Sequence, residues 1–134
     1  MVRPRVLLVD EQQAVVDGIS RLLSDEFDIL GTAPDDDGMI NAAAKLRPDL
    51  IVTDVAMPGT DGLTASLEVL KNQPSLPIVV LSMYHDSQLV RRAFASGARA
   101  YVYKLRAGEE LVTAIHCALH GTTFISPNCV PPAT

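Results

Sequence analysis

The chain has 134 residues, of which 48% are hydrophobic and 20% are charged. This balance is typical of a single globular domain that buries its own core, and it excludes a disordered chain. The formal net charge of −5 argues against a chain that grips nucleic acid by itself. No apolar run approaches the roughly 18 residues needed to span a bilayer, so we expect no membrane partner.

Five apolar runs of strand length recur along the chain. They are residues 5–9, 27–33, 50–53, 77–82 and 100–104. Because the runs are continuously apolar rather than alternating, they are typical of parallel strands that are covered on both faces.

Stretches with helical spacing of apolar residues separate and follow these runs. They lie within residues 15–23, 40–46, 63–70, 89–94 and 111–119. Pro48 prevents Arg47 from continuing a helix, and Gly97 and Gly121 stand where helix C-caps are expected. A strand–helix unit repeated five times predicts an α/β domain with right-handed crossovers and helices on both faces of the sheet.

Polar residues stand at the carboxyl ends of four of the predicted strands. Asp10 and Glu11 follow the first strand, Asp54 follows the third, Ser82 ends the fourth and Lys104 ends the fifth. Ligand sites of open parallel sheets lie beyond these strand ends. We therefore expect three carboxylates, a hydroxyl and an ammonium group to converge on one edge of the sheet.

This set of groups suits phosphoryl transfer. Adjacent carboxylates need a cation, and oxygen-only ligands favour Mg²⁺, or Mn²⁺ in its place. Asp54 would be the nucleophile that forms an acyl phosphate, while Lys104 and the metal neutralise the phosphoryl oxygens. Ser82 would donate a hydrogen bond to one of these oxygens, and Ala56 would offer its backbone carbonyl to the metal.

Four segments resemble the receiver domain of two-component response regulators: "VLLVDE", "PDLIVTDVAMPGTDG", "PIVVLSMY" and "GARAYVYK". The resemblance covers the chain from about Arg5 to about Gly121, with the motifs in order at the strand ends. It implies a flavodoxin-like, doubly wound fold in three α/β/α layers, with a five-stranded parallel sheet of order 2-1-3-4-5.

The resemblance also implies roles for the acidic residues. Asp54 matches the phospho-acceptor, which a histidine kinase phosphorylates in a Mg²⁺-dependent reaction. Asp10 and Glu11 match the acidic pair that holds the metal. Glu11 replaces the commoner second aspartate and reaches one methylene further, an arrangement that we expect to preserve metal binding, directly or through water.

Three further residues match the switching parts of a receiver. Ser82 matches the hydroxyl residue that moves onto the phosphoryl group, Lys104 the lysine of the site and Tyr101 the aromatic switch residue. Phosphorylation is then expected to change the surface formed by the helix at 89–94, the strand at 100–104 and the helix at 111–119.

The segment at 97–127 looks most like receivers of NarL/LuxR-type regulators, which carry a C-terminal helix-turn-helix domain. Only seven residues follow Pro127 here. We therefore expect a receiver domain over 1–121 and a tail or linker over 122–134, as in an excised domain whose DNA contact depends on an output domain not present in this chain. The resemblance allows a homodimer, and a stand-alone receiver acting through protein–protein contacts is the alternative.

Other functions fit the residues less well. Asp54 alone would be read as a loop carboxylate as readily as a nucleophile. A phosphatase of the haloacid dehalogenase type needs an acid two residues after its nucleophile, where this chain has Ala56. We therefore expect a signalling domain rather than an enzyme acting on external substrates. A receiver fold kept only as an unphosphorylated scaffold is disfavoured by the intact Asp54 and Lys104.

Several chemically suggestive groups have ordinary structural interpretations. The acidic run Asp35–Asp37 lacks the ligand spacing of a calcium loop, and we expect it to cap a helix. His116 and His120 are spaced like a metal pair but lack a third ligand, so we assign them to a helix C-terminus. Cys117 and Cys129 have no metal spacing, which predicts free thiols in a reducing, cytoplasmic setting.

Overall fold

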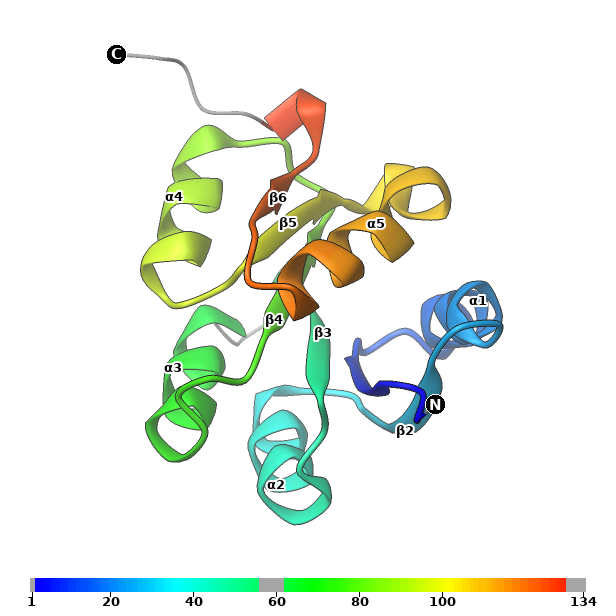
Figure 1. Ribbon diagram of the computed structural model, residues 1–134. Helices are drawn as coiled ribbons and strands as arrows, with labels where there is room; N and C mark the ends of the chain where they lie inside the picture. The colour runs from blue at the N-terminus through cyan, green and yellow to red at the C-terminus, as the bar shows by residue number, and fades with distance from the viewer. Residues whose placement is uncertain (1, 56–61, 130–134) are drawn as a thin grey trace.

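The chain folds into a parallel β-sheet covered by helices on both faces (Figure 1), as seen in a computed structural model that describes residues 2–55 and 62–129. The strand order is β2-β1-β3-β4-β5-β6, and every neighbouring pair is parallel. The strands are β1 (Arg5–Val9), β2 (Asp28–Ala33), β3 (Leu50–Asp54), β4 (Ile78–Ser82), β5 (Ala100–Tyr103) and β6 (Phe124–Ile125).

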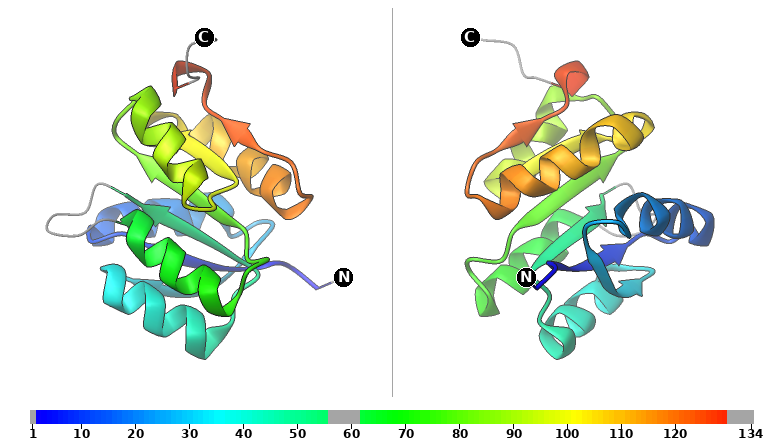
Figure 2. Two further views of the ribbon diagram at one scale, coloured as in Figure 1. Left: turned by 90° about the vertical axis from the view of Figure 1, so that its left-hand side faces the viewer. Right: turned by 45° about the vertical axis from the view of Figure 1, so that its right-hand side comes forward.

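Within residues 2–55 and 62–129, five α-helices and two short 3₁₀ turns connect or follow the strands. The helices are α1 (Gln13–Leu23), α2 (Asp36–Leu46), α3 (Gly62–Asn72), α4 (Ser87–Ala95) and α5 (Ala107–Leu119), and the turns are η1 (Lys104–Arg106) and η2 (Pro127–Cys129). Helices α1 and α5 cover one face of the sheet, and α2, α3 and α4 cover the other (Figure 2).

Alternate residues of each strand serve the two layers. On β1, Val6 and Leu8 pack with residues of α1 and α5, whereas Leu7 and Val9 pack with residues of α2 and α3. All four are at most 2% exposed. Because both faces are covered, the strand has no polar side, which is why its sequence is continuously apolar.

The predicted fold class is confirmed, together with the order 2-1-3-4-5 of the first five strands. The helix ends also follow the predicted punctuation. Helix α2 stops before Arg47, which has a left-handed φ of 49° and precedes Pro48. Gly97 and Gly121 have φ values of 97° and 81°, as expected for C-cap positions.

The sheet has a sixth strand that the sequence analysis did not anticipate. Residues 122–134 were expected to be a tail or the start of a linker. The described part of this segment is built onto the edge of the domain, where Phe124 and Ile125 pair with Ala100 and Tyr101 of β5.

None of the helices within residues 2–55 and 62–129 has the length and apolar character needed to cross a membrane. Cys117 and Cys129 are both free, as predicted.

The left-handed glycines allow a test of the fold. An alanine at Gly97 would be strained by the positive φ, and its Cβ would clash with Cδ1 of Leu70. We expect Gly97→Ala to lower the free energy of unfolding by about 1–2 kcal/mol in urea titrations followed by circular dichroism. Gly18 lies inside α1, and a Cβ added there would meet no atom of the described residues within 4 Å, apart from its chain neighbours and the helix backbone. Gly18→Ala is therefore the matched control and should raise stability by about 0.5–1 kcal/mol. Equal stability of the two variants would contradict this account of the α4–β5 turn.

Candidate functional site

Three charged side chains meet at the carboxyl ends of β1, β3 and β5. Lys104 Nζ lies 2.6 Å from Oδ2 of Asp10 and 2.9 Å from Oδ2 of Asp54. The side chains are only 11%, 4% and 9% exposed, respectively. The predicted convergence of these residues is therefore observed.

Strand register explains why the two carboxylates are neighbours. Val9 of β1 pairs with Thr53 of β3, so Asp10 and Asp54 each stand one residue further along adjacent strands. The backbone of Asp10 is fixed by its N–H, which donates to the Ala33 carbonyl oxygen at 3.0 Å. Its Oδ1 accepts the Gln12 N–H at 2.9 Å, at the entry to α1. Asp10 is therefore held at both its main chain and its side chain.

One ammonium group serves two buried carboxylates, and the site retains a net negative charge. Burial alone would lower the pKa of Lys104, but its hydrogen bonds to Asp10 and Asp54, together with their charges, outweigh that effect and raise the pKa above its ordinary value. Lys104 is thus firmly protonated at neutral pH. The remaining negative charge would attract a cation to this position.

The donor set fits a hard divalent cation in its chemistry. Asp10 and Asp54 supply carboxylate oxygens, the ligands that Mg²⁺ favours, and both contact the ammonium group of Lys104. Glu11 is exposed next to Asp10. The residues described in the structure contain no cluster of three acidic, histidine or cysteine side chains placed to hold a metal, so Glu11 would have to turn inward or act through water. Ala56, the predicted carbonyl ligand, lies outside the described residues.

Ser82 and Tyr101 are linked through the main chain of one residue, Tyr84. The Tyr84 N–H donates to Oγ of Ser82 at 3.0 Å, and the Tyr84 carbonyl oxygen accepts the Tyr101 hydroxyl at 2.7 Å. Ser82 and Tyr101 are completely buried. A displacement of either side chain would therefore be transmitted to the other through the main chain at Tyr84.

Sequence reasoning did not identify Tyr84 as part of this network, because its contribution comes from backbone atoms and its side chain is 58% exposed. It likewise missed Ser126, which is fully buried beside β5 and α5. Neither position carries a residue type that signals a role.

The structural roles predicted for the acidic run Asp35–Asp37 and for the two histidines at the C-terminal end of α5 agree with the structure. Asp35 caps α2, and its side chain accepts the Gly38 N–H at 2.8 Å. His120 is the C-cap residue of α5, and its Nδ1 lies 2.7 Å from the His116 carbonyl oxygen. His116 itself lies 3.0 Å from Glu26.

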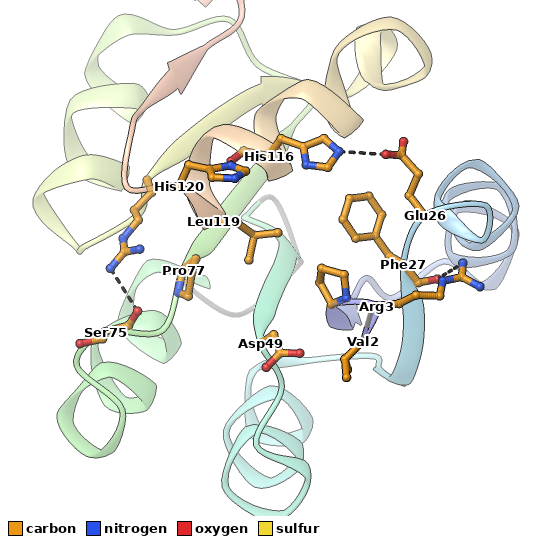
Figure 3. Close-up of a pocket in the computed structure, with 12 residues that line it drawn as sticks. Val2, Arg3, Glu26, Phe27, Asp49, Ser75, Pro77, His116, Leu119 and His120 are labelled. Atoms are coloured by element: carbon orange, nitrogen blue, oxygen red, sulfur yellow. Dashed lines mark hydrogen bonds and ion pairs between the residues drawn. The ribbon is translucent and has the colours of Figure 1, made fainter.

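A large cavity of about 830 Å³ lies at the opposite end of the strands from Asp54 (Figure 3). Its charged groups already have protein partners: His116 faces Glu26, and Arg99 donates to the carbonyl oxygens of Ala118 and Ser75. The buried Lys104–carboxylate cluster, rather than this cavity, is therefore the candidate functional site.

Comparison with known proteins agrees with this geometry. The response regulator receiver domain family matches residues 6–116, and the chain belongs to this family.

Related sequences and solved structures both point to the LuxR/NarL type. The chain is 34% identical to response regulator GacA of Pseudomonas aeruginosa over 125 residues, and 28% identical to oxygen regulatory protein NreC of Staphylococcus carnosus over 126 residues. These matches cover 92% of the chain but only 58% of each relative, so the chain spans little more than half of their length.

Solved structures extend this likeness. A LuxR-family two-component response regulator from Aurantimonas sp. SI85-9A1 superposes with a TM-score of 0.91 at 28% identity, covering 96% of this chain and 93% of that one. The isolated REC domain of RcsB from Salmonella enterica serovar Typhimurium, in the presence of phosphomimetic BeF3⁻, gives 0.85 at 26% identity and 96% coverage of both chains. The resemblance to NarL/LuxR-type receivers is confirmed.

The buried Tyr101 generates a prediction at alkaline pH. Burial raises its pKa to about 12, although the neighbouring Ser82 hydroxyl partly opposes the shift. Because the same group in the unfolded chain has its ordinary value of 10.0, the unfolded state loses this proton first and the tyrosine's contribution to stability declines as pH rises from about 10 to about 12.

Tyr101→Phe should remove this part of the pH dependence. Over that interval the wild-type chain should lose about 2 kcal/mol more unfolding free energy than the variant, in urea titrations at each pH. Tyr84→Phe, which removes an exposed ring hydroxyl, is the control. Parallel pH profiles for wild type and Tyr101→Phe would contradict the buried, neutral Tyr101.

Proposed function

We propose that this domain accepts a phosphoryl group on Asp54 from a histidine kinase and thereby switches a regulatory output. The observation that carries the proposal is the shared contact of Lys104 with Asp10 and Asp54 at the carboxyl end of the sheet. It leaves a carboxylate at a rigid strand end, next to a cation that suits phosphoryl oxygens. The family is one of signalling domains, and no turnover of an external substrate is proposed.

The chemistry at Asp54 is a direct displacement at phosphorus. A carboxylate oxygen of Asp54 attacks the phosphoryl group, the new oxygen–phosphorus bond forms, and the bond to the kinase imidazole nitrogen breaks. The leaving imidazole takes a proton from solvent. Lys104 is positioned to exchange a carboxylate contact for a phosphoryl oxygen, which stabilises the charge that spreads over these oxygens.

Mg²⁺, or Mn²⁺, is the metal that this acidic site would use. Asp10, Glu11 and Asp54 would hold it, with the Ala56 carbonyl as a further ligand. When bound, it supplies positive charge that screens the carboxylates from the incoming phosphoryl group. Asp10 contributes independently by keeping Lys104 in place.

Switching is proposed to run through the Ser82–Tyr84–Tyr101 network. A phosphoryl group adds about −1.5 to −2 charge at neutral pH. The Ser82 hydroxyl would turn toward it, and the Tyr84 peptide and the Tyr101 hydroxyl would respond because they are hydrogen-bonded in series. The surface of α4, β5 and α5 would then shift between two populations.

The output is proposed to be transcriptional control through a DNA-binding domain beyond this chain. The similarity to GacA and NreC, both longer than this chain, supports the proposal. A homodimer of receivers in the cytoplasm is the setting that we propose, and any DNA contact belongs to the output domain. A stand-alone receiver that acts by protein–protein contact is the alternative output.

Phosphoryl uptake tests the proposal. Incubated with acetyl phosphate and Mg²⁺, the wild-type chain should gain one phosphoryl group in intact-mass spectra, and removing the metal with EDTA should abolish the gain. Asp54→Asn should gain none, because its amide is not a nucleophile. Asp49→Asn is the matched control, since Asp49 immediately precedes the same strand at its other end and should leave uptake unchanged.

Equal uptake by Asp54→Asn and wild type would contradict the assignment. Absence of uptake by the wild-type chain under all these conditions would favour the unphosphorylated scaffold instead.

A further inference from the structure

The strand β6 lies beside β5 (Figure 1) and pairs with it over two residues. Further hydrogen bonds join β5 to the residues that follow β6. The Ser126 N–H donates to the Tyr101 carbonyl oxygen at 2.9 Å. Two residues further along β5, the Tyr103 N–H donates to Oγ of Ser126 at 2.8 Å. The serine side chain thus continues the hydrogen bonding of the ladder where β6 ends.

Ser126 also joins this segment to α5. Its hydroxyl donates to the Glu110 carboxylate, which in turn lies 3.6 Å from Nε of Arg106. Ser126 is fully buried, so loss of its Oγ would leave the Tyr103 N–H and the Glu110 carboxylate without this partner in a poorly hydrated place. One hydroxyl therefore binds β5, β6 and α5 together.

Cys129 belongs to the same buried hydrophobic cluster as Tyr101. Its N–H donates to the Ser126 carbonyl oxygen at 2.8 Å, and its side chain is 1% exposed among residues that include Val90 and Ala93 of α4. Burial, and secondarily the Glu110 carboxylate, raises the pKa of the Cys129 thiol. The thiol is thus a neutral, apolar cover for the cluster.

We propose that Ser126 is a positioning residue for Tyr101, and that docking of residues 124–129 is coupled to the phosphorylation state of Asp54. This inference rests on the proposed function, because it assumes that Ser82 and Tyr101 respond to the phosphoryl group. It adds that the chain segment leaving the domain is itself one of the parts that the switch controls.

The direction of the coupling follows from the hydrogen bonds in series. Ser82 and Tyr101 bond the N–H and the carbonyl oxygen of Tyr84. Ser126, just after β6, bonds the Tyr101 carbonyl oxygen, and Cys129 packs in the same buried cluster as Tyr101. A loosened segment would leave Tyr101 mobile, and part of the binding free energy of a phosphoryl group would be spent on ordering it. By reciprocity, a phosphoryl group should tighten the docking of the segment.

The test uses beryllium fluoride with Mg²⁺, a phosphoryl mimic, on the full chain. Ser126→Ala should bind it at least about fivefold more weakly than wild type, as measured by isothermal titration calorimetry. Ser126→Thr, which keeps the hydroxyl, should recover most of the affinity. Thr122→Val is the matched control, because Thr122 Oγ1 donates to the Cys117 carbonyl oxygen of α5 at 3.1 Å, and it should bind like wild type.

A second measurement on the wild-type chain covers the case in which Ser126→Ala fails to fold. Beryllium fluoride should slow amide hydrogen exchange at Tyr103 and Ser126 by at least about fivefold, whereas the Thr122 amide should be unaffected. Unchanged exchange at both amides, or equal affinities of a folded Ser126→Ala and wild type, would overturn the inference while the proposed function stands. A wild-type chain that binds no beryllium fluoride would instead overturn the proposed function, and this inference with it.

Discussion

The shared contact of Lys104 with Asp10 and Asp54 is the interaction on which the rest of the site depends. Two buried carboxylates on adjacent strands would repel each other, and one ammonium group at 2.6 and 2.9 Å makes their proximity tolerable. The cluster still has more negative than positive charge. The fold therefore maintains two buried carboxylates side by side, at a position whose excess negative charge favours a cation.

This arrangement explains why the apolar sequence of β3 ends abruptly in a carboxylate, Asp54. A strand buried on both faces delivers the Asp54 carboxylate with little freedom, and the register with β1 sets the position of Asp10 beside it. Lys104 comes from β5, two strands away, and enters the site at the 3₁₀ turn that precedes α5. Three separate β-α connections thus contribute one group each, and none forms the site alone.

The strands, helices and charged cluster were predictable because they depend on pattern and topology. Continuous apolar runs mark the strands, and the position of Asp10, Asp54 and Lys104 at strand ends places them at one edge of a parallel sheet. The Tyr84 link and the docking of Ser126 were not predictable in this way. Tyr84 contributes only its backbone N–H and carbonyl oxygen to the network. A two-residue strand such as β6 is too short to show periodicity in the sequence.

The prolines after residue 126 also explain why the C-terminal segment looked like a linker. Pro131 and Pro132 disfavour regular structure, but the preceding Ser126 and Cys129 are buried against β5 and α4. Burial of this kind is decided by the partner surface rather than by local sequence. The described part of this segment consequently packs against β5 and α4 up to Cys129.

Chemical mapping of the modified residue would show whether Asp54 receives the phosphoryl group. The wild-type chain would be treated with acetyl phosphate and Mg²⁺, reduced with borohydride and digested for peptide mass spectrometry. An aspartyl phosphate is reduced to homoserine, so the account predicts homoserine at position 54 alone. Homoserine at Asp10, or a phosphorylated chain with an unaltered Asp54, would contradict it.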